Sequence, residues 1–238
     1  MIQFSVFLNS RGRPQLLENA INSVYDNCSY PNSIEMLVRV DTDDRETIRA
    51  LNTLEHPNLS YFVGPRPQNL IASYNELVNQ AKGQYLFVFN DDVQLLTKDW
   101  DKIILNKIES FKKERGIVDD IVYCETSDTS VDKTAGHDYC SFMIISKEAV
   151  DALGYFMNEA FVTLGGDSHI HRIYKAIDRI VDCKEILLDH IGHNTIERIM
   201  NPDIVAAEYR QKAWITSPSP FDFDIKDEIN RLRAYVNK

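Results

Sequence analysis

The chain has 238 residues, of which 44% are hydrophobic and 26% are charged, and its formal net charge is −10 at pH 7. These proportions are ordinary for a globular protein with a sizeable core, and the negative charge disfavours a nucleic-acid polymer as partner, because phosphates attract a basic surface. Four widely spaced cysteines without a CxxC pair exclude a zinc ribbon and a disulfide scaffold, and no run reaches the roughly 18 apolar residues of a transmembrane segment.

The first hundred residues alternate between predicted strands and predicted helices. The N-terminal stretch begins with a strand and lacks the basic start of a signal peptide, so we expect a cytoplasmic protein with free thiols. Apolar runs predict strands at 4–8, 34–40, 59–63 and 85–89. Helical spacing predicts helices from Pro14, over 48–54, and over 74–81, the last ended by Gly83. This order predicts an α/β fold with a mainly parallel, Rossmann-like sheet and helices on both faces.

The second half of the chain is less regular. Its predicted elements are an amphipathic helix over 99–114, a short strand at 121–124, a polar loop over 125–138, a strand at 139–146, a helix over 147–154 that Gly154 ends, a helix from 165, one or two strands over 179–189 and a loop over 190–203. We interpret residues 1–215 as a single domain with a nucleotide-binding half (1–100) and an acceptor and catalytic half (101–215). For residues 216–238 we expect a proline-rich hinge and a helix that covers the acceptor pocket or mediates self-association.

Polar side chains follow three of the predicted parallel strands, at Asn9–Arg13, Asp41–Asp44 and Asn90–Asp92. In parallel sheets, ligands bind outside the carboxyl ends of the strands. Asp91 and Asp92 are suitable hard-oxygen ligands for Mn²⁺ or Mg²⁺, with phosphate oxygens in the remaining positions. Adjacent residues on an extended chain point in opposite directions, so we expect one of the two to bind the metal directly. A plain turn is the alternative interpretation.

The loops after the first and third strands carry three arginines, Arg11, Arg13 and Arg66, which are suitable partners for a diphosphate. Their alternative role is that of ordinary surface arginines. Asp41, at the tip of the second strand, is predicted to read a base or ribose, although acids in this loop also suit a helix N-cap. A phosphatase motif formed by Asp41 and Asp43 is disfavoured, because Arg45 replaces the Thr or Val of that motif.

Two later segments offer further candidates. Asp167 follows two glycines at the start of a predicted helix, where it is either a general base or an N-cap. His190 and His193 follow an apolar strand, and either histidine is a candidate metal ligand beside the acids. We prefer His190 because it is nearer the end of the strand.

Four segments together resemble the glycosyltransferases of family 2 and their relatives with the GT-A fold. The segments are "FSVFLNSRGRP", "IEMLVRVDTDD", "NELVNQAKGQYLFVFNDDV" and "SKEAVDALGYFMNEAFVTLGGDSHIHR". The resemblance implies a metal-dependent enzyme that moves a sugar from a nucleotide-diphosphate sugar donor to a glycan, lipid or other hydroxyl acceptor, with inversion at the anomeric carbon. It also implies roles for particular residues: Asn9, Arg11 and Asp41 in the base and ribose pocket, Asp91 and Asp92 as the DxD-type element with Asp92 the metal ligand, Asp167 as catalytic base, and His190 completing the metal site.

The sequence departs from the family pattern in places. Asn90 stands where a strict DxD element has its first acid, and "GGD" replaces the common "ED" before the base. One alternative is a nucleotidyltransferase, but that class carries a Gly-rich, Lys-containing first loop, whereas "NSRGRPQ" has one glycine and no lysine. The other alternative is a non-catalytic relative that binds a sugar or a nucleotide.

Overall fold

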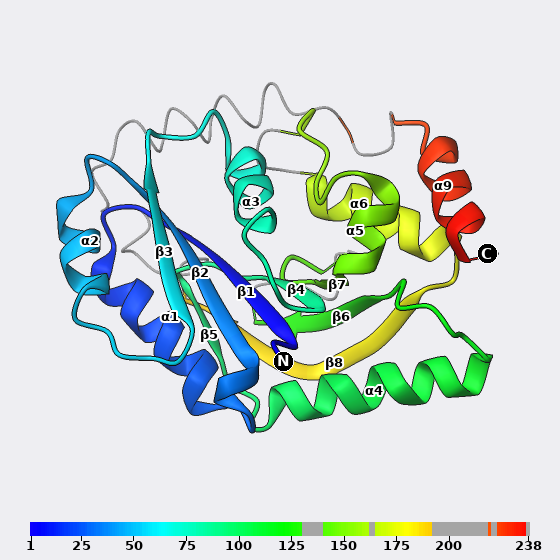
Figure 1. Cartoon of the computed structure of the whole chain (residues 1–238), viewed down its shortest axis with the longest axis horizontal. Helices are drawn as coiled ribbons and strands as arrows, with labels where there is room; N and C mark the ends of the chain where they lie inside the picture. The colour runs from blue at the N-terminus through cyan, green and yellow to red at the C-terminus, as the bar shows by residue number, and fades with distance from the viewer. Residues whose placement is uncertain (130–139, 162–164, 192–218, 220–222, 237–238) are drawn as a thin grey trace.

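An eight-stranded sheet forms the centre of the structure, a computed structural model that describes residues 1–129, 140–161, 165–191, 219 and 223–236 (Figure 1). The strands are β1 Phe4–Ser10, β2 Ile34–Asp41, β3 Leu59–Gly64, β4 Tyr85–Val88, β5 Val93–Leu95, β6 Tyr123–Asp128, β7 Ile144–Ser146 and β8 Ile180–His190. The helices are α1 Pro14–Asp26, α2 Arg45–Leu51, α3 Leu70–Val78, α4 Trp100–Arg115, α5 Lys147–Leu153, α6 Gly166–Ala176 and α9 Lys226–Val236, with a 3-10 helix, η1 Pro31–Ser33. The strand order in the sheet is β3-β2-β1-β4-β7-β6-β8-β5.

The N-terminal part of the sheet is parallel, as the alternation of strands and helices predicts. β1 pairs in parallel with β2 and β4, and β2 pairs in parallel with β3. β7 is antiparallel to both of its neighbours, and β5 is antiparallel to β8. Every residue of β2 and β4 is buried, which agrees with their nearly continuous apolar runs. The predicted α/β fold with a mainly parallel sheet is therefore confirmed.

Alternating strand residues face two hydrophobic cores, one on each side of the sheet. Phe4 of β1 faces the core shared with α1, α2 and α4, in which Trp100 is fully buried. Phe7 of β1 faces the other core, which is shared with α3, α5, α6 and α9. Figure 1 shows α4 along the lower side of the strands, and α3, α5, α6 and α9 above them. Helices therefore cover both faces.

Gly83 has a different role from the one predicted. α3 ends at Val78, with Asn79 as its C-cap. Gly83 lies where the chain passes β1 on its way into β4: its amide donates to Ser5 Oγ at 2.8 Å, and an added Cβ would lie 2.5 Å from the backbone nitrogen of Ser5. The prediction that Gly83 ends the helix is wrong, because α3 ends before it. The glycine is explained instead by its close approach to β1, which leaves no room for a side chain.

Part of the polar loop predicted over 125–138 forms a strand instead. Residues 125–128 form the C-terminal part of β6, which lies between β7 and β8. The buried hydroxyl of Thr126 donates to the carbonyl oxygen of Phe142 at 2.7 Å, so a polar residue here has a partner inside the structure. Polar composition therefore gave a wrong prediction for this stretch. Residues 130–139 of the same predicted loop lie outside the described residues.

The C-terminal helix α9 forms as predicted and packs against α5 and α6. Leu232 is fully buried in the core on that side, and the Arg231 guanidinium donates to the carbonyl oxygen of Leu153 at 3.0 Å. The proposed hinge lies largely outside the described residues, so the division at residue 215 stays a prediction. None of the described helices combines the length and apolar character that crossing a bilayer requires.

Candidate functional site

The site begins with the two acids after β4, which one arginine bridges. Asp91 is 1% exposed, and its Oδ2 accepts a hydrogen bond of 2.8 Å from Ser10 Oγ. Arg13, directly before α1, places Nη2 2.5 Å from Asp91 Oδ1 and Nη1 3.2 Å from Asp92 Oδ2. Burial raises the pKa of Asp91, and the positive charge of Arg13 opposes that rise. The loop after β1 is thereby tied to the acidic pair.

The second acid also faces His190, at the end of β8. Asp92 Oδ1 is buried, accepts no hydrogen bond from the described part of the chain and lies 3.6 Å from His190 Nε2. Backbone pairing holds the two side chains together: His190 pairs with Val93 of β5, and the amide of Ile191 donates to the carbonyl oxygen of Asp92 at 3.0 Å. Within the described ranges, no three His, Cys, Asp or Glu side chains form a metal-binding group. His193 lies outside those ranges.

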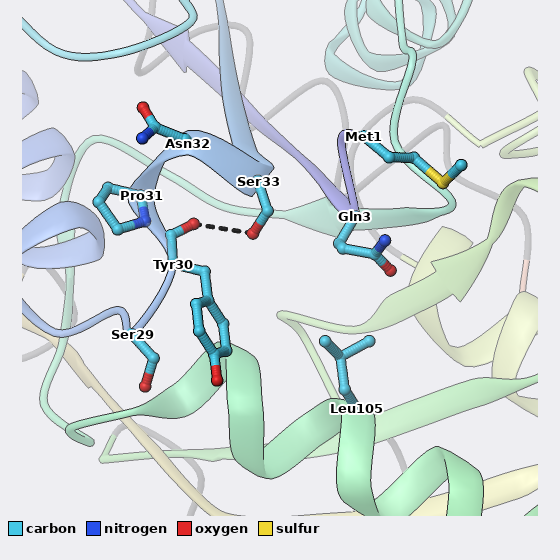
Figure 2. Close-up of a pocket in the computed structure, with 8 residues that line it drawn as sticks. All are labelled: Met1, Gln3, Ser29, Tyr30, Pro31, Asn32, Ser33 and Leu105. Atoms are coloured by element: carbon cyan, nitrogen blue, oxygen red, sulfur yellow. Dashed lines mark hydrogen bonds between the residues drawn. The ribbon is translucent and has the colours of Figure 1, made fainter.

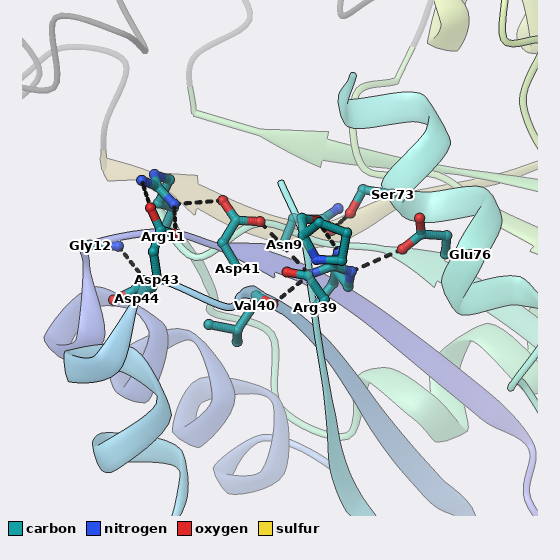
Figure 3. A network of polar contacts seen from close by, with 12 residues as sticks. Asn9, Arg11, Gly12, Arg39, Val40, Asp41, Asp43, Asp44, Ser73 and Glu76 are labelled. Atoms are coloured by element: carbon teal, nitrogen blue, oxygen red, sulfur yellow. Dashed lines mark hydrogen bonds and ion pairs between the residues drawn. The ribbon is translucent and has the colours of Figure 1, made fainter. Parts of the chain in front are cut away.

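A second cluster joins the loops after β1 and β2 (Figure 3). Arg11 Nη1 lies 2.7 Å from Asp41 Oδ2, and the same guanidinium donates to both oxygens of Asp43 at 2.6 and 2.8 Å. This hydrogen bonding lowers the pKa of Asp43 to about 2. Asp44 caps α2 through the amide of Thr47 and also accepts from the amide of Gly12 at 2.7 Å. The acids of this loop therefore serve as a helix cap and as partners of the first loop.

Sequence reasoning missed Arg39, the buried arginine of β2. Its Nε donates to Glu76 Oε2 of α3 at 2.9 Å, its Nη2 donates to the carbonyl oxygen of Pro65 at 2.6 Å, and its Nη1 lies 3.7 Å from Asp41 Oδ1. Figure 3 shows the guanidinium between the strand tips and α3. The sequence contains one signal that could have identified Arg39, which is a charged residue inside the otherwise apolar end of "IEMLVRV".

The start of α3 supplies further polar partners that the sequence did not indicate. Ser73 Oγ donates to Asn9 Oδ1, so the side chain of Asn9 is attached to α3. The Tyr74 hydroxyl lies 2.6 Å from Asn90 Oδ1 and 2.8 Å from the carbonyl oxygen of Phe89. Asn90, at the position of the missing first acid, is therefore held by a neutral hydroxyl.

Two candidates are not joined to the acidic pair by any contact among the described residues. Arg66 is exposed in the loop between β3 and α3, where its charge contributes to the low pKa of Asp43. Asp167, in the first turn of α6, accepts a hydrogen bond of 2.7 Å from the amide of Ser168. Burial raises the pKa of Asp167. The adjoining residues 162–164 lie outside the described ranges.

A shallow pocket lies at the other end of the strands (Figure 2). Its lining includes Met1 and Gln3, which precede β1, Tyr30 and Ser33, which precede β2, and Leu105 of α4. The Ser33 hydroxyl donates to the carbonyl oxygen of Tyr30 at 2.7 Å. This pocket contains none of the titratable clusters described above, so the carboxyl ends of the strands remain the candidate site.

The sequence of the chain matches that of a known protein family. The sequence model described as glycosyl transferase family 2 matches residues 5–179. The chain belongs to this family. Its membership confirms the resemblance inferred from the four sequence segments. One curated relative of this family 2 chain, the O-antigen biosynthesis protein RfbC of Myxococcus xanthus, is 27% identical over 96 residues. These residues make up 40% of the chain and only 8% of the length of that relative.

Solved structures share the fold of the family 2 chain. The mannosyltransferase PcManGT of Pyrobaculum calidifontis, in complex with GDP-Man and Mn²⁺, has a TM-score of 0.63 at 14% identity over 98% of this chain and 69% of its own. TarS 1–349 of S. aureus in complex with UDP-GlcNAc has a TM-score of 0.60 at 13% identity over 94% of this chain and 74% of its own. At this level of identity the likeness establishes a shared GT-A fold.

Proposed function

We propose that the chain transfers a sugar from a nucleoside-diphosphate sugar to a hydroxyl group of an acceptor. The observation that carries this proposal is the meeting of Asp91, Asp92, Arg13 and His190 at the carboxyl edge of the sheet in a family 2 chain. Ligands of parallel α/β sheets bind at this edge. The names of two structural neighbours, which record GDP-Man and UDP-GlcNAc, support a donor of the same chemical class.

Asp92 and His190 fit a divalent cation. Asp92 Oδ1 is buried, has no hydrogen bond within the described ranges and faces an imidazole nitrogen, and carboxylate and imidazole groups are both ligands of Mn²⁺. Two protein ligands leave positions for phosphate oxygens, which is the usual arrangement for Mg²⁺ and Mn²⁺ at a diphosphate. Bound there, the cation supplies positive charge to the departing diphosphate.

The loops after β1, β2 and β3 are proposed to hold the nucleotide. Arg11 and Asp41 present a cation and a carboxylate side by side, and Asn9 adds a buried amide beside them. Arg66 is exposed at the same edge and is suited to a phosphate. Arg13 keeps the acidic pair in place, and its fork of donors extends to the same diphosphate.

Asp167 is proposed to remove the proton from the acceptor hydroxyl. Its raised pKa brings the carboxyl group closer to the operating pH, which favours a general base. A single base that activates the acceptor predicts direct displacement and inversion at the anomeric carbon. The acceptor itself is proposed to be a glycan, a lipid or another hydroxyl compound, bound by the second half of the chain.

A donor screen with Mn²⁺ tests this function. The purified chain is incubated with UDP-, GDP-, dTDP- and CDP-sugars and with glycan or lipid acceptors, and the released nucleotide is identified. Sugar transfer is expected to release a nucleoside diphosphate and to form a product of inverted anomeric configuration by NMR. A parallel reaction with nucleoside triphosphates and sugar 1-phosphates tests the alternative, since pyrophosphate released there would identify a nucleotidyltransferase. Binding without release from any donor would identify a non-catalytic relative.

A further inference from the structure

Arg39 is the one positively charged residue of β2, and it is buried. It is 5% exposed, and its neighbours on the strand, Val38 and Val40, are fully buried apolar residues. A guanidinium keeps its charge in such a place, so every donor needs a partner inside the structure. The partners of Arg39 come from three separate elements of the candidate site (Figure 3).

The first two partners are the tip of β2 and the loop after β3. Nη1 lies 3.7 Å from Asp41 Oδ1 and donates to the carbonyl oxygen of Val40, while Nη2 donates to the carbonyl oxygen of Pro65 at 2.6 Å. Gly64 leaves room for this contact, since a Cβ there would lie 2.7 Å from Arg39 Nη2. The third partner is Glu76 of α3, at 2.9 Å from Nε. One guanidinium therefore connects Asp41, the loop that carries Arg66, and α3.

The two oxygens of Asp41 are held by different arginines. Arg11 binds Oδ2 from the loop after β1, and Arg39 lies beside Oδ1 from within the sheet. Asp41 is 6% exposed, so its carboxylate has little freedom to find another orientation. Arg11 is about one-third exposed, whereas Arg39 is buried in β2, where it pairs with Phe62 of β3. Arg39 therefore orients the carboxylate of Asp41 from within the sheet.

Stability alone is a poor explanation for Arg39. Placing a charge inside a protein carries a desolvation cost, and apolar side chains of similar volume are often as stable or more stable in such positions. Glu76 is more than half exposed and remains hydrated without its partner, and Asp41 keeps Arg11. What an apolar side chain cannot supply is the simultaneous connection of a carboxylate, a loop carbonyl and a helix.

We infer that Arg39 is a positioning residue for nucleotide recognition, acting through Asp41 and the loop after Gly64. The inference rests on the proposed function, because it assumes that a nucleotide binds at this edge. Arg39 touches no reacting group in this arrangement. Its loss should therefore weaken binding of the donor, with a higher KM, and leave kcat of the saturated enzyme nearly unchanged.

Calorimetric titration of the full chain with UDP, GDP, CDP and dTDP in the presence of MnCl₂ tests this inference. We expect the nucleotide that binds the wild-type chain to bind Arg39→Met about tenfold more weakly, the loss typical of one charge-assisted hydrogen bond. Arg39→Lys keeps the charge but cannot reach all three elements, so an intermediate loss is expected. Arg49→Met, on the exposed face of α2, is the matched control and should bind like the wild type.

A double-mutant cycle separates positioning from a general structural effect. If Arg39 acts through Asp41, Arg39→Met should change nucleotide affinity much less in an Asp41→Asn background than in the wild type. Equal losses in both backgrounds, or an unchanged affinity of folded Arg39→Met, would overturn the inference and leave the proposed function standing. If Arg39→Met does not fold, as judged by thermal melting, Arg39→Lys is used for the same cycle. A wild-type chain that binds none of the four nucleotides would overturn the proposed function, and this inference with it.

Discussion

Arg13 Nη2 lies 2.5 Å from Asp91 Oδ1, at the start of a helix where the backbone dipole disfavours a positive charge. The fully buried carboxylate of Asp91 compensates for that position, and the guanidinium in turn makes the burial of Asp91 possible. The pair also holds the loop after β1 against the loop after β4. It is therefore part of the framework of the site.

The first prediction is that Arg13→Met destabilises the chain. The change leaves Asp91 buried with only Ser10 as a partner, and breaking a buried ion pair in this way costs about 3 kcal/mol. The free energy of unfolding in urea measures the loss. Arg13→Met combined with Asp91→Asn should recover most of it, because the second change removes the uncompensated charge. Surface substitutions usually change the free energy of unfolding by less than about 0.5 kcal/mol. A change no larger than this for Arg13→Met alone would contradict the proposed role.

The second prediction concerns Asp92 and His190. Asp92→Asn and His190→Ala should each lower the affinity for Mn²⁺ in the presence of nucleotide, and with it sugar transfer, by about 100-fold or more, since even indirect metal partners contribute 10- to 100-fold. Bound Mn²⁺ is measured by electron paramagnetic resonance, independently of turnover. Asp26→Asn, at the exposed end of α1, is the control. Full activity of Asp92→Asn in the presence of a chelator would exclude this metal site.

The third prediction separates binding from chemistry at Asp167. Asparagine keeps an oxygen for the amide of Ser168 but cannot accept a proton, so Asp167→Asn should fold and bind the donor normally. Transfer should fall by about 10²- to 10⁴-fold, the usual contribution of a general base. Single-turnover transfer and nucleotide titration on the same preparation measure the two effects. An equal loss in donor affinity and transfer would assign Asp167 a role in binding instead.

The parallel sheet and the location of the site follow from local pattern, whereas the side-chain pairing does not. Continuous apolar runs identify β1, β2 and β4 because both faces of these strands are buried, and the polar residues that follow them must meet at one edge. The bonds of Arg39 depend on how β2 and β3 align and on the path of the loop after Gly64. No spacing in the sequence encodes that alignment. For the same reason, the pairing of Arg13 with the acids was not predicted, although all three residues were selected.

His169 of α6 is buried in an aromatic cluster on the side of the helix that faces the segment leading into α9. His169 is 1% exposed, and neither ring nitrogen has a hydrogen-bond partner among the residues that the structure describes. Its ring lies 5.1 Å from that of Phe161 and 5.5 Å from that of Phe223, just before α9. Burial lowers the pKa of His169 from its usual 6.5, with Glu228 of α9 opposing the shift and Arg172 of α6 adding to it.

The fourth prediction is that His169 makes the chain less stable in acid. Well above pH 6.5 the histidine is neutral in both the folded and the unfolded chain and contributes no pH dependence. As the pH falls below 6.5, the unfolded chain takes up a proton that the folded chain resists, so the free energy of unfolding decreases. Between pH 7.5 and 5.5 the decrease from this group is at most about 1.4 kcal/mol, the value that corresponds to one pH unit for one proton. His169→Phe keeps the aromatic packing and removes the titration, so its urea midpoint should fall less than that of the wild type. Parallel decreases in the two proteins would show that His169 does not cause the acid sensitivity.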